Sequence, residues 1–192
     1  SERVANGHPL KAAFAAEIAT RLPEGGFVFI DAGSTNLAVA EAIRPGRQMT
    51  VMTNAPAIAA VLTLSSDVEV IMTGGSVNRE LGGSIGARAT ASLDGLYPDV
   101  FVLGTCGIVR GEGMFASDAE EQVFKARVAE RSRHIITAAD GDKFTEAAPY
   151  RIAPFSPEVT LLVEEDKDQD LSLIAATGAE IVRVRGKEMA RG

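Results

Sequence analysis

The chain has 192 residues, of which 46% are hydrophobic and 23% are charged, so its length and composition fit one globular domain with an ample core. Its net charge of −7 argues against a nucleic-acid-binding surface, which is normally basic, and its single cysteine, Cys106, excludes an internal disulfide and a multi-cysteine zinc site. We find no apolar run near the roughly 20 residues of a membrane span and no signal peptide at the start, so a cytoplasmic location is expected.

The first predicted element is an amphipathic helix over Pro9–Leu22. Its apolar residues recur at a spacing of four from Leu10 to Leu22 and form one face, and a proline and two glycines at positions 23–26 end it. Because this helix begins almost at the first residue, we expect the chain to be cut from a longer protein.

Strand and helix patterns alternate through the rest of the chain. The apolar, mostly β-branched runs that predict strands are Phe27–Ile30, Met49–Met52, Val68–Met72, Val100–Leu103, His134–Thr137, Val159–Val163 and Glu180–Val184. The helical patterns are Thr35–Ile43, Ala55–Leu64, Ile85–Leu96, Ala119–Arg131 and Asp168–Thr177. This alternation predicts an α/β fold with a mostly parallel sheet and helices on both faces. A glycine-rich turn at Gly111–Gly113 predicts a hairpin and an antiparallel edge of the sheet.

The stretch at 27–36 has the features of an anion site. A buried strand stops at Asp31, turns through Gly33 and enters a helix for which Ser34 or Thr35 is the expected cap. The unpaired N–H groups and the dipole of a helix N-terminus, together with the side-chain donors up to Asn36, can hold a phosphate. The alternative is an ordinary strand-to-helix turn with a Ser/Thr cap, and this stretch alone leaves both interpretations open.

Polar and glycine residues follow four further predicted strands, at Thr53-Asn54, Thr73–Gly75, Gly104–Gly107 and Ala139–Lys143. In parallel sheets ligands bind at the carboxyl ends of the strands, and all these residues are expected at that edge. Convergence of five such segments favours a ligand site over five independent loops.

These pieces, in their order, resemble the C-terminal effector domain of DeoR-type transcriptional repressors. The matching segments are Ile30–Thr35, Met52–Asn54, Thr73–Gly75, Leu103–Ile108, Asp118–Glu121 with Lys125, and Ala139–Phe144. The resemblance runs from about Pro9 to Val184 and implies a fold like that of ribose-5-phosphate isomerase and a phosphorylated sugar as effector. It also implies that residues 1–24 are a linker helix from a missing N-terminal winged helix-turn-helix, and that residues 25–192 are the effector-binding domain.

The chain departs from the family pattern at two places. Many members have an aspartate where this chain has Cys106, and the related isomerases use acidic residues in that region for catalysis. The Asp-Gly-Asp-Lys form at 140–143 replaces a commoner Asp-Ser-Ser-Lys; it keeps Asp140 and Lys143 but removes hydroxyls. The first departure argues against isomerase activity, and the second leaves the identity of the effector open.

The candidate effector-binding residues are Asp31, Gly33, Ser34, Thr35, Asn36, Thr53, Asn54, Gly74, Gly75, Gly104, Cys106, Gly107, Asp118, Glu121, Lys125, Asp140 and Lys143. Four of them, at 33–36, form the expected phosphate cradle, and Lys143 can add a point charge. Asp31 is expected to accept a hydrogen bond from a sugar hydroxyl. The glycine pairs at 74–75 and 82–83 bracket a segment that is either an anion-binding turn or a flap over the site.

Each candidate also has a purely structural explanation. Asp31 can stabilise a turn, and Lys143 can be a solvated loop lysine. Asn54 before Ala55-Pro56 is a suitable helix N-cap. Ser117 and Glu120 match a capping box, and Glu121 with Lys125 is an i,i+4 ion pair. These local roles would explain the residues at the start of this helix without a ligand. Only the family resemblance indicates that they contact the sugar.

Two other functions compete with an effector sensor. A sugar-phosphate isomerase would use Glu121 or Asp140 as the base and Lys143 or Lys125 as the electrophile. A nucleotide-cofactor domain ranks last, because neither a complete G-x-G-x-x-G nor a Walker lysine follows the first strand. We therefore expect a non-enzymatic homo-oligomer, dimer or tetramer, without a cofactor or metal, that meets DNA only through a domain absent from this chain.

Overall fold

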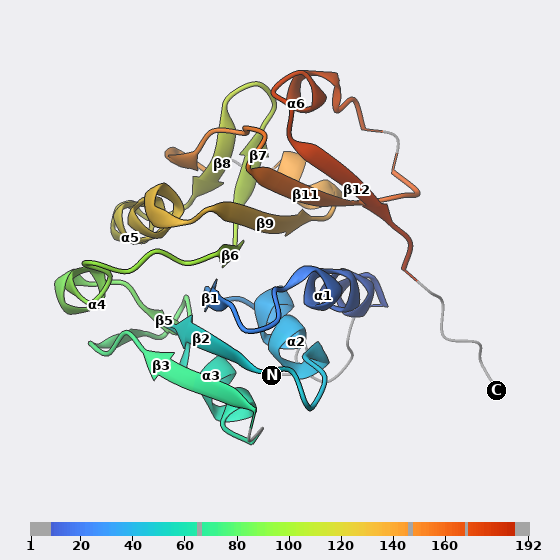
Figure 1. The fold of residues 1–192 in the computed structure, drawn as a ribbon. Helices are drawn as coiled ribbons and strands as arrows, with labels where there is room; N and C mark the ends of the chain where they lie inside the picture. Colours follow the sequence, from blue (N-terminus) through green and yellow to red (C-terminus); the bar gives the residue numbers. More distant parts are fainter. Residues whose placement is uncertain (1–8, 65–66, 146–147, 168, 187–192) are drawn as a thin grey trace.

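The computed structural model describes residues 9–64, 67–145, 148–167 and 169–186, and its centre is a seven-stranded sheet (Figure 1). The strands of this sheet are β1 (Phe27–Ile30), β2 (Met49–Thr53), β3 (Val68–Met72), β6 (Val100–Leu103), β9 (His134–Ala139), β11 (Val159–Glu164) and β12 (Glu180–Val184). Their order is β12-β11-β9-β6-β1-β2-β3, and every neighbouring pair is parallel. The predicted parallel sheet is confirmed.

The helices are α1 (Pro9–Arg21), α2 (Ser34–Ala42), α3 (Pro56–Leu62), α4 (Ala87–Ala91), α5 (Ala119–Arg131) and α6 (Ser172–Ala175). Two of them are much shorter than their patterns predicted. After α4 the chain continues to Leu96 in tight turns, with hydrogen bonds from Leu93 N–H to Thr90 and from Leu96 N–H to Leu93. The same tightening follows α6, where Thr177 N–H donates to Ile174; the predicted start of that helix, Asp168, lies outside the described residues.

Two apolar clusters cover the two faces of the sheet. Alternate residues of β1 point to opposite faces, so Val28 and Ile30 pack with α1, α2 and α3. Phe29 instead packs against Phe101 and against Phe124 of α5. The expectation of helices on both faces is confirmed. None of the helices in the described part of the chain has the length and apolarity that crossing a membrane would need.

The predicted hairpin is present, but the prediction that it makes an antiparallel edge of the main sheet was wrong. Strands β7 (Gly107–Val109) and β8 (Gly113–Ala116) pair with β10 (Tyr150–Ala153) in a separate antiparallel sheet, and the main sheet ends in the parallel strands β3 and β12. The reason is burial: Ile108 and Met114 are enclosed in the apolar cluster that contains Phe124 of α5, so the hairpin covers a face of the sheet.

Two small elements lie beside the carboxyl ends of the central strands. Strands β4 (Val77–Asn78) and β5 (Gly83–Ser84) form an antiparallel hairpin in the segment expected to be a flap. A short 3-10 helix, η1 (Gly141–Phe144), follows β9.

The strand order places a crevice beside β1. The chain runs from β1 to β2 and β3 on one side of the sheet and then returns to β6 on the other side of β1. The connections after β1 and β6 therefore leave in opposite directions, and the carboxyl ends of these two strands stay uncovered. Such a switch point is where open α/β sheets bind ligands.

Candidate functional site

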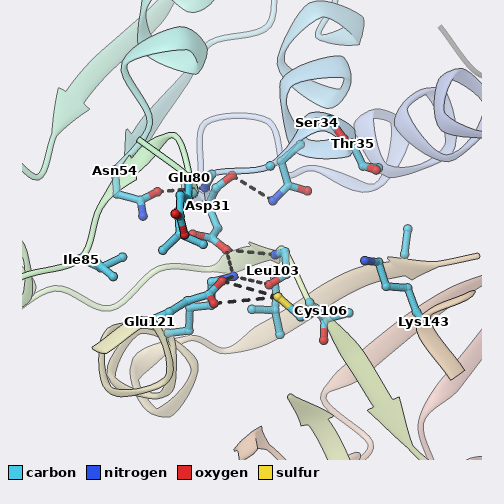
Figure 2. A pocket seen from close by; sticks show the side chains of 18 residues that line it. Asp31, Ser34, Thr35, Asn54, Glu80, Ile85, Leu103, Cys106, Glu121 and Lys143 are labelled. Carbon is cyan, nitrogen blue, oxygen red and sulfur yellow. Dashed lines mark hydrogen bonds and ion pairs between the residues drawn. The ribbon is translucent and has the colours of Figure 1, made fainter. Parts of the chain in front are cut away.

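A cavity of about 250 Å³ lies at this switch point (Figure 2). The predicted residues that line it are Asp31, Gly33, Ser34, Thr35, Asn36, Asn54, Gly104, Cys106, Glu121, Lys125 and Lys143. They come from the carboxyl ends of β1, β2 and β6, from the first turn of α2, from the first two turns of α5, and from η1. The structure thus brings together residues that are 112 positions apart in the sequence, from 31 to 143.

The remaining predicted residues do not line the cavity: Thr53, Gly74, Gly75, Gly107, Asp118 and Asp140. Thr53 is buried and its hydroxyl accepts a hydrogen bond from Ala55 N–H. Asp118 and Asp140 are the N-caps of α5 and η1, and their carboxylates accept hydrogen bonds from Glu121 N–H and Lys143 N–H. These contacts orient the helices that carry Glu121 and Lys143.

At three helices the observed N-cap residue differs from the one that the sequence suggested. The N-cap of α2 is Gly33, that of α3 is Ala55 and that of α5 is Asp118, where we expected Ser34 or Thr35, Asn54, and the Ser117 capping box. Asn54 is displaced from capping because its Oδ1 accepts a hydrogen bond from Ala32 N–H at 2.9 Å, across from β1. The Asn54 side chain therefore forms a tertiary hydrogen bond instead of the local helix cap that the sequence suggested.

Several lining residues were not anticipated, and the most informative are on the β4–β5 hairpin. Glu80 and Leu81 lie in its turn, and Ile85 follows β5. The glycine pairs that suggested a flap were the available signal, because they bracket this turn. The remaining unanticipated lining residues are Ala32, Leu103, Thr105 and Ala138.

The N-terminus of α2 opens into the cavity without a side-chain cap. Gly33 has φ 145° and ψ 152°, a conformation that L side chains rarely adopt, and among the described residues no side-chain cap hydrogen bond is made at this helix start. The first N–H groups of α2 and the positive end of its dipole therefore face the cavity, next to the hydroxyls of Ser34 and Thr35. This end of the cavity suits an anion.

Asn36 has a different role from the one predicted for its side chain. It is buried, and its Nδ2 donates to the carbonyl oxygens of Asp31 at 2.9 Å and of Val102 at 3.1 Å. Both amide protons thus tie the end of β1 to β6. Only the backbone N–H of Asn36 remains for the anion end of the cavity.

A buried ionic cluster forms another wall of the cavity. Lys125 Nζ lies 2.9 Å from Asp31 Oδ2 and 2.6 Å from Glu121 Oε1, and it donates to the carbonyl oxygen of Gly104 at 2.5 Å. The side chains of Asp31, Glu121 and Lys125 are at most 5% exposed. The predicted i,i+4 pair of α5 is confirmed, but Asp31 of β1 joins it from a distant part of the chain.

The cluster holds two carboxylates and one ammonium, and burial and the contacts between them shift the pKa values of Asp31 and Lys125. Burial alone would lower the pKa of Lys125, but the neighbouring Asp31 and Glu121 outweigh it and raise that pKa to about 12. Burial also raises the pKa of Asp31 above its usual value, a shift that Lys125 offsets only in part. Lys125 is therefore the fixed charge of the cluster, and Asp31 takes up a proton more readily than an exposed aspartate does.

Two lysines lie at the anion end. Lys143 of η1 lines the cavity, and Figure 2 shows its ammonium group turned toward the other labelled side chains. Lys11 of α1 donates a hydrogen bond to Ser34 Oγ at 2.9 Å and so joins the first helix to the start of α2. Lys11 was not among the predicted site residues, because no local pattern indicates which neighbour the polar side of a helix meets.

Cys106 lies on the cavity wall beside Glu121. Its sulfur is 3.9 Å from each carboxylate oxygen of Glu121 and 3.6 Å from Ser117 Oγ. The thiol is half-buried and forms weak polar contacts with the ionic cluster.

The fold and the cavity define a class of α/β ligand-binding domain whose site lies where the strand order reverses. The chain belongs to the DeoR family: the model of the DeoR C-terminal sensor domain matches residues 7–166. The resemblance stated from the sequence is thereby confirmed.

The relatives are transcriptional regulators. The glycerol-3-phosphate regulon repressor of Escherichia coli K12 is 30% identical over 146 residues, which are 76% of this chain and 58% of that protein. The uncharacterized HTH-type regulator YgbI of the same strain is 32% identical over 178 residues, 86% of this chain and 68% of that protein. The chain thus spans little more than half the length of the repressor it matches.

Solved structures show the same fold in proteins of different function. Ribose 5-phosphate isomerase A from Neisseria gonorrhoeae superposes with a TM-score of 0.52 at 18% identity, over 72% of this chain and 54% of that one. A chain of the tetrameric eIF2B complex from C. thermophilum reaches 0.51 at 14% identity, over 70% of this chain and 44% of that one. The expected isomerase-like fold is confirmed, and the fold alone does not distinguish a catalyst from a binding domain.

Proposed function

We propose that this chain is the effector-sensing domain of a cytoplasmic DeoR-type transcriptional repressor, and that its effector is a phosphorylated sugar or sugar-metabolism intermediate. The observation that carries the proposal is a cavity with two chemically different ends. One end has the uncapped N-terminus of α2 with Lys143, and the other has the buried Asp31–Glu121–Lys125 cluster. A phosphate suits the first end, and neutral polar groups suit the second.

Charge supports this orientation of the ligand. At the α2 end, N–H groups, hydroxyls and a lysine all favour an anion. At the cluster end, carboxylates outnumber the ammonium, and Glu80 adds another acidic side chain to the lining. A phosphate dianion there would meet like charge, so the phosphate belongs at α2.

The output of the sensor would pass through α1. We propose that residues 1–24 lead to a DNA-binding domain, and that residues 25–192 bind the effector; residues 1–8 lie outside the described part of the chain. Helix α1 packs on the core through buried residues and contacts the site through Lys11. The effector could bind more tightly to the domain with α1 in one position than to the domain with α1 in another. Its binding would then shift the population of DNA-binding states. A dimer or tetramer of such subunits would match a two-fold operator.

The proposal predicts that phosphorylated sugars stabilise the chain and that their unphosphorylated counterparts do not. A ligand present at about 100 times its dissociation constant raises the free energy of unfolding by about 2.7 kcal/mol. A thermal-shift screen of paired sugars and sugar phosphates measures this. Replacing Lys143 with alanine should weaken binding of the active compound about tenfold, because a charge-assisted hydrogen bond is lost.

Lys167→Ala is the matched control for Lys143→Ala. Lys167 is exposed and lies beside η1, where its side chain approaches Gly141, but it does not line the cavity. Its replacement should leave the shift unchanged. Equal stabilisation by a sugar and its phosphate would remove the argument for an anion at α2.

Lys11→Met should weaken phosphate binding about tenfold while the chain stays folded. The substitution removes the cation that contacts Ser34 Oγ but keeps an unbranched side chain on α1. Calorimetric titration with inorganic phosphate measures the effect without assuming which sugar is bound. We expect Arg21→Met, at the other end of α1, to leave the titration unchanged, because Arg21 pairs with Glu17 and Glu180. Unaltered binding by Lys11→Met would show that α1 does not sense the ligand.

The geometry gives the competing isomerase no specific support. Glu121, a candidate base, is held by Lys125 at 2.6 Å, and Asp140, the other candidate, caps η1 and does not line the cavity. Turnover of ribose 5-phosphate by the purified chain would nevertheless favour the enzyme over the sensor.

A further inference from the structure

A groove of about 860 Å³ runs between α4 and α5, which lie next to each other on one side of the molecule (Figure 1). Small apolar side chains form much of its wall: Ala87 and Ala91 come from α4, and Ala126 comes from α5. Val123 of α5 also lines the groove and is 57% exposed. A contiguous apolar hollow on a protein surface is a typical site of contact with another protein, whereas a single exposed valine is not.

The groove lies behind one wall of the ligand cavity. Glu121 and Lys125 of α5 line the cavity, while Val123 and Arg127 of the same helix line the groove. Ile85, which lies between β5 and α4, belongs to both linings. A partner in the groove would therefore contact the same two elements that enclose the cavity from this side.

The charges along the exposed side of α5 change sign from one end to the other. Glu120 precedes Val123 and Arg127 follows it, and the seven-residue spacing places both charged side chains on one flank of the helix, about two turns apart. Both residues line the groove. If a second α5 lies antiparallel, with Val123 near the centre of the contact, each Glu120 is opposite Arg127 of the other copy. A parallel arrangement would place like charges together.

Two further features of α5 favour an antiparallel pair. Ala119 and Ala126 flank Val123 on the side away from the charged residues, so they would face each other and allow the helices to approach closely. Antiparallel packing also places the positive end of each helix dipole near the negative end of the other. The outer side of α5 is therefore complementary to a second copy of itself.

We propose that this groove is a dimerisation surface, and that its occupant is α5 of a second copy of the chain, packed antiparallel about a two-fold axis near Val123. The inference rests on the proposed homo-oligomer and assigns the surface through which two copies meet. In such a contact each copy presents the same patch and receives it. Each α5 would then form a dimer contact with one side and a cavity wall with the other.

Cross-linking near the two-fold axis tests this arrangement. Cys106, the single cysteine, is first replaced by serine, and Val123→Cys is then introduced. Helices packed about 8–10 Å apart carry Cα atoms about 2.3 Å from each axis, so facing Cα atoms approach to roughly 3.4–5.4 Å, within reach of a disulfide. We expect oxidation by copper–phenanthroline to convert most of this variant to a covalent dimer on a non-reducing gel.

Leu173→Cys in the same background is the matched control. Leu173 of α6 is 56% exposed, nearly the same fraction as Val123, and it does not line the groove. This variant should remain a single chain on the gel after the same oxidation. Equal cross-linking at both positions would indicate random collisions and would overturn the assigned surface.

Reversal of charge tests the antiparallel pairing. Glu120→Arg or Arg127→Glu alone places like charges across the interface, and each should raise the dimer dissociation constant about tenfold in sedimentation experiments. The double variant restores opposite charges and should return the constant to within about threefold of the original. An effect inside one copy would not give this rescue, because the two residues are about 10 Å apart along the helix.

The outcomes distinguish the surface from the rest of the proposed function. A dimer that neither cross-links through Val123→Cys nor responds to the charge variants would overturn the surface and leave the homo-oligomer standing. A chain that sediments as a monomer at every concentration would overturn both. Neither result would affect the effector sensor, which the thermal-shift screen tests separately.

Discussion

Replacing Lys125 with methionine is expected to lower the free energy of unfolding by about 3–5 kcal/mol at neutral pH. Methionine nearly preserves the length of the side chain but leaves Asp31 and Glu121 buried without their cation. It also removes the donor to the carbonyl oxygen of Gly104. Urea unfolding at pH 7 measures the loss, since the midpoint and slope together report the free energy.

The same variant should recover part of its stability in acid. Burial already raises the pKa of Asp31 above 3.8, and removing Lys125, which lowers it, raises it further. The folded variant then binds a proton more tightly than the unfolded chain, so its stability increases as pH falls through the folded pKa of Asp31. A deficit that does not change with pH would show that lost packing, and not unpaired charge, causes it.

Arg127→Met is the control for the loss of a cation from α5. Arg127 is paired with Asp94 at 3.2 Å, but both side chains are exposed, at 44% and 66%. Exposed ion pairs contribute little, so we expect a change below about 1 kcal/mol. A loss as large as that of Lys125→Met would mean that any change on α5 destabilises the chain.

Gly104→Ala should abolish the response to phosphosugars and destabilise the chain by about 1–3 kcal/mol. A Cβ at this position would lie 2.8 Å from Ala32 O, a backbone atom that cannot rotate away, and 3.0 Å from Asp31 Oδ2. The strain falls on the loops after β1 and β6, which together form the cavity floor. Chemical unfolding gives the stability, and thermal shift with the active phosphosugar gives the response.

Gly86→Ala distinguishes this effect from a general cost of replacing glycine. Gly86 precedes α4, and a Cβ there would meet open space, without an unusual φ. We expect this variant to keep both its stability and its phosphosugar response. A normal response by Gly104→Ala would contradict the placement of the ligand between the two loops.

The pattern of residues predicted most of the fold, because it is set by burial. Central strands enclosed on both faces, such as Phe27–Ile30 and Val100–Leu103, have continuous apolar sequences. All seven predicted strands are present in the sheet, including the partly exposed edge strands β3 and β12. The hairpin at Gly111–Gly113 was also predicted from the sequence, but its position in a separate sheet was not predicted. That depends on which surface buries Ile108 and Met114, and no local signal contains this information.

The sequence predicted which residues gather at the candidate site, but not which hydrogen bonds each of them makes there. Strand ends of a parallel sheet collect at one edge, so eleven of the proposed residues line one cavity. Their individual partners were less predictable: Asn54 holds Ala32 instead of capping α3, and Asn36 bridges β1 and β6. These are tertiary hydrogen bonds that replace the local ones suggested by sequence spacing.

By itself the sequence determined the parallel α/β fold, the family and the sheet edge where a ligand would meet the chain. These follow from periodicity, glycine placement and ordered motifs, which are local properties. Only the tertiary structure decided that Asp31 shares Lys125 with Glu121 and that Lys11 reaches Ser34. Such contacts join residues from distant parts of the chain, and their chemistry exists only after burial has removed water from around them.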